Sequence, residues 1–200
     1  MAITINGTGS ITGLTAGGLP DGSIVAGDLA SSLDLTGKTV TLPSGTGGKI
    51  LQVVQATKTD TFSDAQSPPY TDWVDVAGLS VSITPQSSSN KILVIAQVSV
   101  VAAAAQPCAA RLLRGSTTIN IADAAGSRTP SSVSTRTESG QSLAALPIMY
   151  LDSPATTSSI TYKIQVAAEG TVFVNRTGSD SDASAYYRAA SSITVMEVAA

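Results

Sequence analysis

Apolar and polar residues alternate along much of the chain after residue 48. Leu79, Val81 and Ile83 alternate with serine and threonine, and residues 160–166 repeat the pattern. A period of two residues is typical of a β-strand that buries one face. Ser-, Pro-, Gly- and Asp-rich stretches separate the apolar runs and are expected to form turns. The pattern predicts strands at 49–58, 73–76, 79–84, 91–103, 109–121, 133–138, 142–151, 158–168, 171–175 and 185–198.

The chain changes character near Gly48. Residues 1–48 are rich in glycine, and their apolar residues are too irregularly spaced for a sustained helical or strand period. A segment this short cannot bury a core alone, so either it is unstructured or several copies wrap together. Eight to ten strands in residues 49–200 suit a jelly-roll-like β-sandwich. We therefore predict an all-β protein with an extended N-terminal stalk, 1–48, and a sandwich knob, 49–200.

Two of the predicted strands are apolar on both faces. In residues 91–101 the even-numbered positions are all apolar, and the odd-numbered ones are half apolar. The last strand shows the same property at 193–198. The outer face of a two-sheet sandwich normally carries polar residues. A loop or a second subunit must then cover the outer face, and the low charge of the chain favours a subunit. The candidate interface residues are Leu93, Ile95, Val101, Met196 and Val198.

Composition supports a strand-rich, packed chain and limits its partners. Hydrophobic residues make up 42% of the sequence, too many for a disordered chain. Charged residues make up 12%, roughly half of the share in an average domain. The net charge of −3 and eleven scattered Lys and Arg residues argue against nucleic-acid binding. The longest apolar run, 92–105, is too short to span a bilayer, and the N-terminus lacks the pattern of a signal peptide. We expect a soluble protein that is neither exported nor inserted into membranes.

The absence of histidine removes most catalytic schemes. Without imidazole there is no Ser-His-Asp or Cys-His nucleophile and no His-ligated metal. Cys108 is the only cysteine, and we expect it to be a small buried hydrophobe. The segment 43–50 resembles a phosphate-binding loop but has Pro43 and Ile50 where that motif needs Gly and Ser or Thr. These observations predict no bound cofactor.

The carboxylates offer equally little to catalysis or metal binding. Asp180 and Asp182 have a calcium-loop spacing without the glycine and glutamate of such a loop, so we expect a solvated turn. Asp72 and Asp75 flank an aromatic residue but lie on opposite strand faces by parity. A carboxylate pair between subunits is the one catalytic route that the sequence leaves open. We predict no catalytic residues and no metal site.

Four aromatic residues are candidates for contact with a glycan: Tyr70, Trp73, Tyr186 and Tyr187. Aromatic rings present flat apolar surfaces with a polar edge, which suits stacking against sugars. The alternative for each is packing inside the sandwich.

The first half of the chain resembles bacteriophage fibre and appendage proteins, especially those of marine phages. The resemblance rests on the opening ITINGTGSITGLTAGGLPDGSIVAGDLASSLDLTGKTVTLPSGTGGKILQVVQ and on YTDWVDVAGLSVSITPQSSSNKILVIAQVSV. Within the first phrase, GLPDGSIVAGDLA is similar to segments common in tail-fibre shafts. The resemblance implies parallel homotrimers, N-terminal attachment to the particle and a C-terminal knob that faces the host.

The resemblance leads to a functional hypothesis. We expect a homotrimeric virion fibre that is assembled in the host cytoplasm, attached to tail or capsid proteins through residues 1–48, and able to contact a host-surface glycan. Three weak contacts on one trimer would add avidity. Only about 48 residues precede the knob, fewer than in most tail fibres, which leaves a short fibre on the capsid open. The alternatives are a capsid decoration protein or head fibre with no essential receptor and, with less support, a carbohydrate-binding module of a cellular protein.

Overall fold

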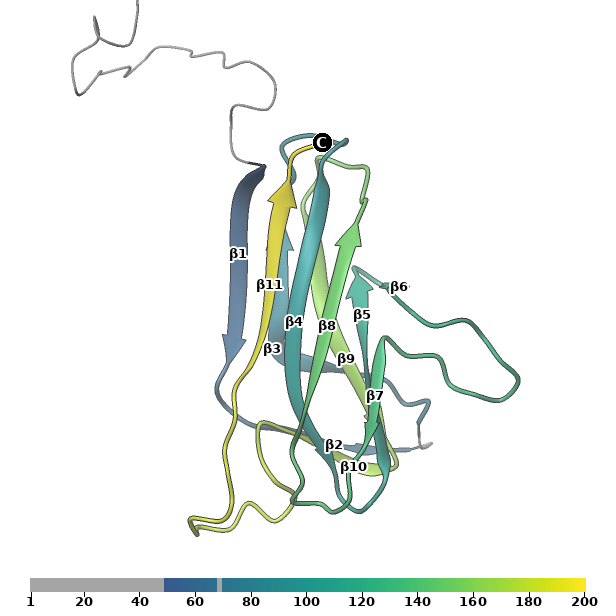
Figure 1. Cartoon of the computed structure of the whole chain (residues 1–200), viewed down its shortest axis with the longest axis vertical. Coiled ribbons are helices and arrows are strands. Elements are labelled where there is room, and N and C mark those ends of the chain that lie inside the picture. Colours follow the sequence, from purple (N-terminus) through teal and green to yellow (C-terminus); the bar gives the residue numbers. More distant parts are fainter. Residues whose placement is uncertain (1–48, 68–69) are drawn as a thin grey trace, which may run out of the picture. The chain divides into compact units, whose positions relative to one another are not determined.

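The computed structural model describes residues 49–67 and 70–200, and these residues form an all-β sandwich of two antiparallel sheets (Figure 1). The predicted fold class is confirmed. The strands are β1 (Ile50–Lys58), β2 (Phe62–Gln66), β3 (Val74–Ile83), β4 (Lys91–Ala102), β5 (Pro107–Arg114), β6 (Thr117–Ile119), β7 (Val133–Arg136), β8 (Ala144–Asp152), β9 (Ile160–Ala168), β10 (Gly170–Val174) and β11 (Ser191–Val198). The predicted stalk, 1–48, lies outside the described residues.

The order of the strands is that of a jelly roll. One sheet, which we call sheet A, contains β1, β11, β4 and β8 side by side, with β10 and β2 continuing it beside the last residues of β4. The other, sheet B, contains β3, β9 and β5, with β6 and β7 on the free side of β5. When β2, β6 and β10 are set aside, the first strand pairs with the last, the second with the second last, and so on inward. This is a long antiparallel ribbon rolled into two sheets.

The core between the sheets is almost entirely aliphatic, as the composition suggests. Alternate residues of each strand point inward, and Val94, Leu112, Ile164 and Ile193 are completely buried. The buried core residues that are not aliphatic are Cys108 and Tyr162, and the Tyr162 hydroxyl donates a 2.6 Å hydrogen bond to Asp152 Oδ2. Arg114 Nη1 contacts both oxygens of the same carboxylate at 2.9 and 3.0 Å. A buried polar group is tolerated where its partners replace water, and here they do.

Four of the predicted strands differ from the structure in extent or division, and most other strand ends are shifted by one or two residues. The expected strand 109–121 is divided by a turn at Gly115, which has φ +60°, into β5 and β6. The expected strands 73–76 and 79–84 form one strand, β3, whose register shifts around Gly78 at φ +82°. The last strand, β11, begins at Ser191 rather than at 185. Glycine adopts these positive φ values without steric cost, which allows a turn at one site and a register shift at the other.

One strand was missed because its sequence carries no apolar run. β2 has the sequence FSDAQ, and it exists because its backbone pairs with β10. A polar strand of this kind is held by its neighbour and cannot be recognised from its own periodicity.

Polar side chains organise the point where β4 changes its partner from β11 to β10. Ser99 lies between the two pairings, and its backbone N–H donates to Ser191 Oγ at 2.9 Å. Its carbonyl accepts from the Asn175 N–H at 2.9 Å. Asn175 is fully buried with φ +61°, and its side chain bonds the carbonyls of Lys58 and Asp60. These bonds satisfy backbone groups that regular pairing would otherwise leave open.

Candidate functional site

Sheet A presents an apolar row of residues to the outside, and polar residues such as Thr194 and Gln55 lie beside it. Val53 of β1 lies opposite Met196 of β11, which lies opposite Leu93 of β4, and Leu93 lies opposite Leu151 of β8. In the next row, Ile95 pairs with Met149. We call the apolar face the set Val53, Leu93, Ile95, Met149, Leu151, Met196 and Val198. Figure 1 shows the four strands that carry it side by side.

The apolar face is open to solvent in this chain. The exposed fractions of Val53, Met149 and Leu151 are 56, 68 and 47%. The other members are half-buried. Among the outward positions of the four strands only Lys91, at the end of β4, is charged. A hollow of about 520 Å³ opens here, bordered by Ile95 and Met149 and by uncharged polar residues that include Gln55 and Thr194. Contiguous exposed apolar surface marks an interaction site more often than an inert surface.

Four of the five candidate interface residues lie together on this face: Leu93, Ile95, Met196 and Val198. Val101 does not belong with them. It is 0% exposed within the single chain, so it has no surface to offer a partner. Its odd-numbered position correctly predicted the outward side of β4. Other residues of the same chain, however, cover the last residues of that strand.

Sequence reasoning missed the exposed members on the edge strands, Val53, Met149 and Leu151. The signal was present in 146–151, where Leu146 and Ile148 point inward while Met149 and Leu151 point outward. The criterion that selected β4 and β11, apolar residues on both faces of the strand, selects β8 as well.

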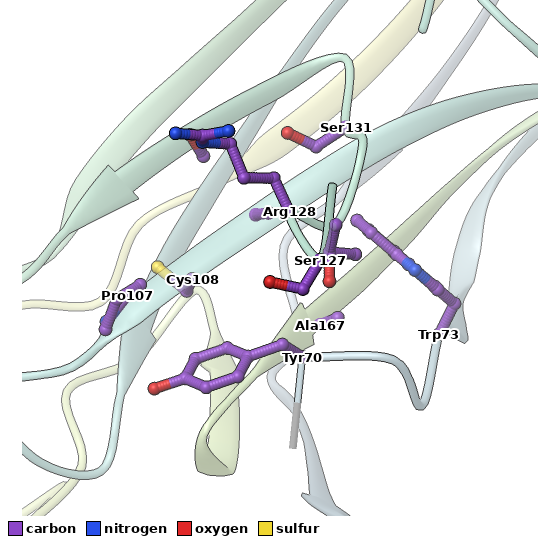
Figure 2. A pocket seen from close by; sticks show the side chains of 11 residues that line it. Tyr70, Trp73, Pro107, Cys108, Ser127, Arg128, Ser131 and Ala167 are labelled. Atoms are coloured by element: carbon purple, nitrogen blue, oxygen red, sulfur yellow. The ribbon is translucent and has the colours of Figure 1, made fainter. Parts of the chain in front are cut away.

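The candidate glycan contacts divide into two groups. Tyr70 and Trp73 line one pocket of about 380 Å³ on the outer side of sheet B (Figure 2). Ser127, Arg128 and Ser131 belong to the segment on its other side. Neither Tyr186 nor Tyr187 contributes to this pocket. The alternative of packing inside the sandwich does not describe Tyr70 or Trp73, which are half-buried at the pocket wall.

Tyr186 and Tyr187 lie in the long loop before β11. Tyr187 is 72% exposed, whereas Tyr186 is half-buried. The loop is fixed by Arg188, whose Nε and Nη2 each donate a 2.7 Å hydrogen bond to an oxygen of Asp180. Both oxygens of Asp180 are therefore bound to a guanidinium, as expected of a turn and not of a calcium ligand.

The outer side of sheet B is polar and cross-linked. Arg111 Nε donates to Gln165 Oε1 at 2.8 Å, and Gln165 Nε2 donates to Asp75 Oδ1 at 2.7 Å. Lys163 Nζ completes the row at 2.6 Å from Asp75 Oδ2. The Arg111 guanidinium also lies 4.4 Å from the centre of the Trp73 ring. This arrangement fixes the indole through a cation–π contact.

The titratable groups of this region are not tuned for catalysis. Burial raises the pKa of the Cys108 thiol to about 11, so it stays protonated and weakly nucleophilic at neutral pH. Burial also opposes ionisation of Asp75, but hydrogen bonds from Lys163 and Gln165 outweigh it and lower the pKa. Asp75 is thus an anion at neutral pH and not a proton donor. Within residues 49–67 and 70–200, no cluster of three His, Cys, Asp or Glu could hold a metal ion.

Comparisons with known proteins give only distant likenesses. No protein-family model matches the chain, and no curated protein sequence matches it. Similar solved structures include the infectious bursal disease virus VP2 subviral particle, at TM-score 0.34 and 13% identity over 86% of this chain and 50% of that one. Another is the T=1 particle derived from infectious bursal virus, at TM-score 0.35 and 13% identity over 86 and 48%. The Gx strain of infectious bursal disease virus matches at TM-score 0.36 and 11% identity over 80 and 46%.

The chain spans about half the length of the VP2 chains that it matches. At this distance we base neither a family nor a function on the likeness. The jelly-roll assignment rests on the pairing of the strands. In the part of the chain that the structure describes, no helix has the length and apolar character needed to cross a bilayer.

Proposed function

We propose that this protein is a non-enzymatic structural protein of a bacteriophage virion. In this proposal three copies form a short fibre or appendage, held on the particle by residues 1–48, with residues 49–200 as its knob. The N-terminal resemblance to phage fibres supports the viral assignment. The observation that carries the assembly is the apolar face: seven apolar residues in register across four strands, with a single charge at the rim.

A second copy of the chain is the occupant that best suits the apolar face. The face carries almost no charge, so it offers no electrostatic complement to an acidic or basic partner. Around a threefold axis the same residues of three copies converge, and each apolar face is buried by its neighbours. Val53 and Met149, at opposite edges of sheet A, would then meet across the boundary between neighbouring copies.

The oligomeric state tests the assembly directly. Light scattering on the full-length protein is expected to give about 60 kDa, three times the chain mass of 20.1 kDa. A mass near that of one chain at micromolar concentration would contradict the proposal.

Removal of residues 1–48 tests their proposed role as the anchor. We expect residues 49–200 to fold alone and to show the far-ultraviolet spectrum of a β-protein, while losing incorporation into particles. A fragment that still joins virions would place the attachment in the knob instead.

Labelling of virions and binding of the knob to cells together distinguish a fibre from a decoration protein. We expect an N-terminal gold label on virions to mark one discrete location and purified knobs to bind host cells. Labels spread over the capsid together with knobs that do not bind would favour a decoration protein or head fibre with a structural role alone.

A further inference from the structure

The pocket on sheet B exists because small residues occupy one row of the sheet. Ala167 of β9 lies opposite Ala109 of β5, which lies opposite Ser134 of β7. The adjacent row contains the long side chains of Arg111 and Gln165. The short side chains of one row lie beside the long side chains of the next, and this difference in length leaves a hollow of about 380 Å³. A volume of this size lies within the range of small-molecule sites.

Two aromatic rings on the wall are held in place before any ligand arrives. Arg111 fixes the Trp73 ring from the sheet, as described above. The Tyr70 hydroxyl donates a hydrogen bond to Glu169, and this bond raises the pKa of the hydroxyl. Rings that are already fixed lose little conformational entropy on binding. They offer apolar surface for the C–H faces of a sugar ring.

The opposite side of the pocket supplies hydroxyl groups and one guanidinium. Ser127, Arg128 and Ser131 lie along the segment that follows β6 (Figure 2). Thr129 of the same segment also lines the pocket. Within the described residues the Arg128 side chain donates a single weak hydrogen bond, at 3.3 Å to the Ala125 carbonyl. Unlike Arg114, Arg176 and Arg188, it takes part in none of the ion pairs of the described residues. Among the pocket residues that the structure describes, none is a carboxylate. An exposed guanidinium with unused donors suits a carboxylate or a sulfate.

We propose that this pocket binds an acidic sugar unit, with the sugar ring against Tyr70 and Trp73 and its carboxylate or sulfate on Arg128. The inference deepens the proposed function, because an acidic host polysaccharide would be the surface that the knob contacts. It also fits the proposed assembly, which buries sheet A and leaves the outer side of sheet B exposed. A trimer would then hold three such pockets and gain avidity from them.

The only tryptophan of the chain lines this pocket, which gives a direct optical test. Full-length protein is titrated with trigalacturonate, with a chondroitin sulfate tetrasaccharide and with neutral maltotriose, while Trp73 emission is followed. We expect a saturable change with at least one acidic saccharide, at least tenfold weaker binding of maltotriose, and weaker acidic binding as salt is raised. Absence of a saturable change with both acidic saccharides, or equal binding of maltotriose, overturns the inference.

Matched variants assign the binding to the pocket. Arg128→Gln is expected to weaken acidic-saccharide binding at least tenfold, and its exposed position should leave the fold intact. Lys91→Gln removes the same charge from sheet A and is expected to change binding less than twofold. Arg128→Gln that binds like the unmodified protein overturns the inference. A trimer that binds no acidic saccharide refutes this site alone, whereas a monomer that binds one refutes only the proposed assembly.

Discussion

The two outer surfaces of the sandwich differ in chemistry although they share one architecture. On sheet A one complete row of outward residues is apolar, namely Val53, Met196, Leu93 and Leu151, and the row beside it contains no charged residue. On sheet B the corresponding positions form the hydrogen-bonded row of Arg111, Gln165, Asp75 and Lys163. The second surface is what a solvated sheet needs. The apolar row of sheet A has an unfavourable free energy of hydration in the single chain, because its area stays in contact with water until a partner covers it.

Under the proposed function the two surfaces have different roles, because sheet A is covered by other copies and sheet B stays exposed to solvent. A surface that is to be buried against identical copies gains from the absence of charge, because each unpaired charge in an interface must lose its water. A surface that remains exposed keeps its polar groups and can shape a pocket among them.

The largest effect is expected from Ile148→Asp, on the core side of β8. Ile148 is 3% exposed, so the new carboxylate would be buried without a partner. We expect a loss of more than about 4 kcal/mol in the free energy of unfolding, or insoluble expression. Denaturation followed by circular dichroism measures it. A variant that keeps the unfolding midpoint of the unmodified protein would contradict the assignment of this side to the core.

Met149→Asp, one residue further along β8, is expected to leave the fold intact and to dissociate the assembly. Met149 is 68% exposed in the single chain, so its replacement does not disturb the core. Each new carboxylate would be buried without a partner at a boundary between copies, and light scattering should show a mass near 20.1 kDa. Ile95→Asp should act in the same way. Ser80→Asp, on exposed β3 of sheet B, adds the same charge and should leave the mass unchanged.

Asp75→Asn on the polar surface is expected to have a modest effect on stability. The carboxylate is half exposed, at 50%, so losing its contacts with Lys163 and Gln165 should cost about 0.5–1 kcal/mol. Its pKa is lower in the folded protein than in the unfolded chain, so its contribution is complete above pH ~4. That contribution disappears as the pH falls through the folded-state pKa. Urea unfolding at several pH values checks this, since the variant should lose less stability on acidification.

The smallest effect is expected from Tyr187→Ala, which belongs to neither surface. The side chain is 72% exposed, so the free energy of unfolding should change by less than about 0.5 kcal/mol. Binding of acidic saccharides should also be unchanged, because Tyr187 does not line the pocket on sheet B. A clear loss of binding would move the glycan contact to the loop before β11.

Local patterns predicted those parts of this molecule that depend on neighbours in sequence. The alternation at Leu79, Val81 and Ile83 placed the buried side of β3 correctly, and all three side chains are buried in the structure. The apolar positions Leu93 and Met196 were correctly placed on outward faces, because the side-chain period of a strand is two. The polar strand β2 was missed, because its existence depends on β10 and not on its own residues.

Alternation and composition were enough to predict a β-protein with an aliphatic core and the outward residues of its main apolar strands. That Val53 and Leu151 join Leu93 in one surface follows from the strand pairing, since Val53 and Leu151 are about a hundred residues apart in the chain. The tertiary structure also decided that Val101 is covered and that Tyr70 and Trp73 share a pocket with Arg128. The physical reason is that a strand's period depends on adjacent residues, whereas its neighbours in a sheet are chosen by pairing between distant segments.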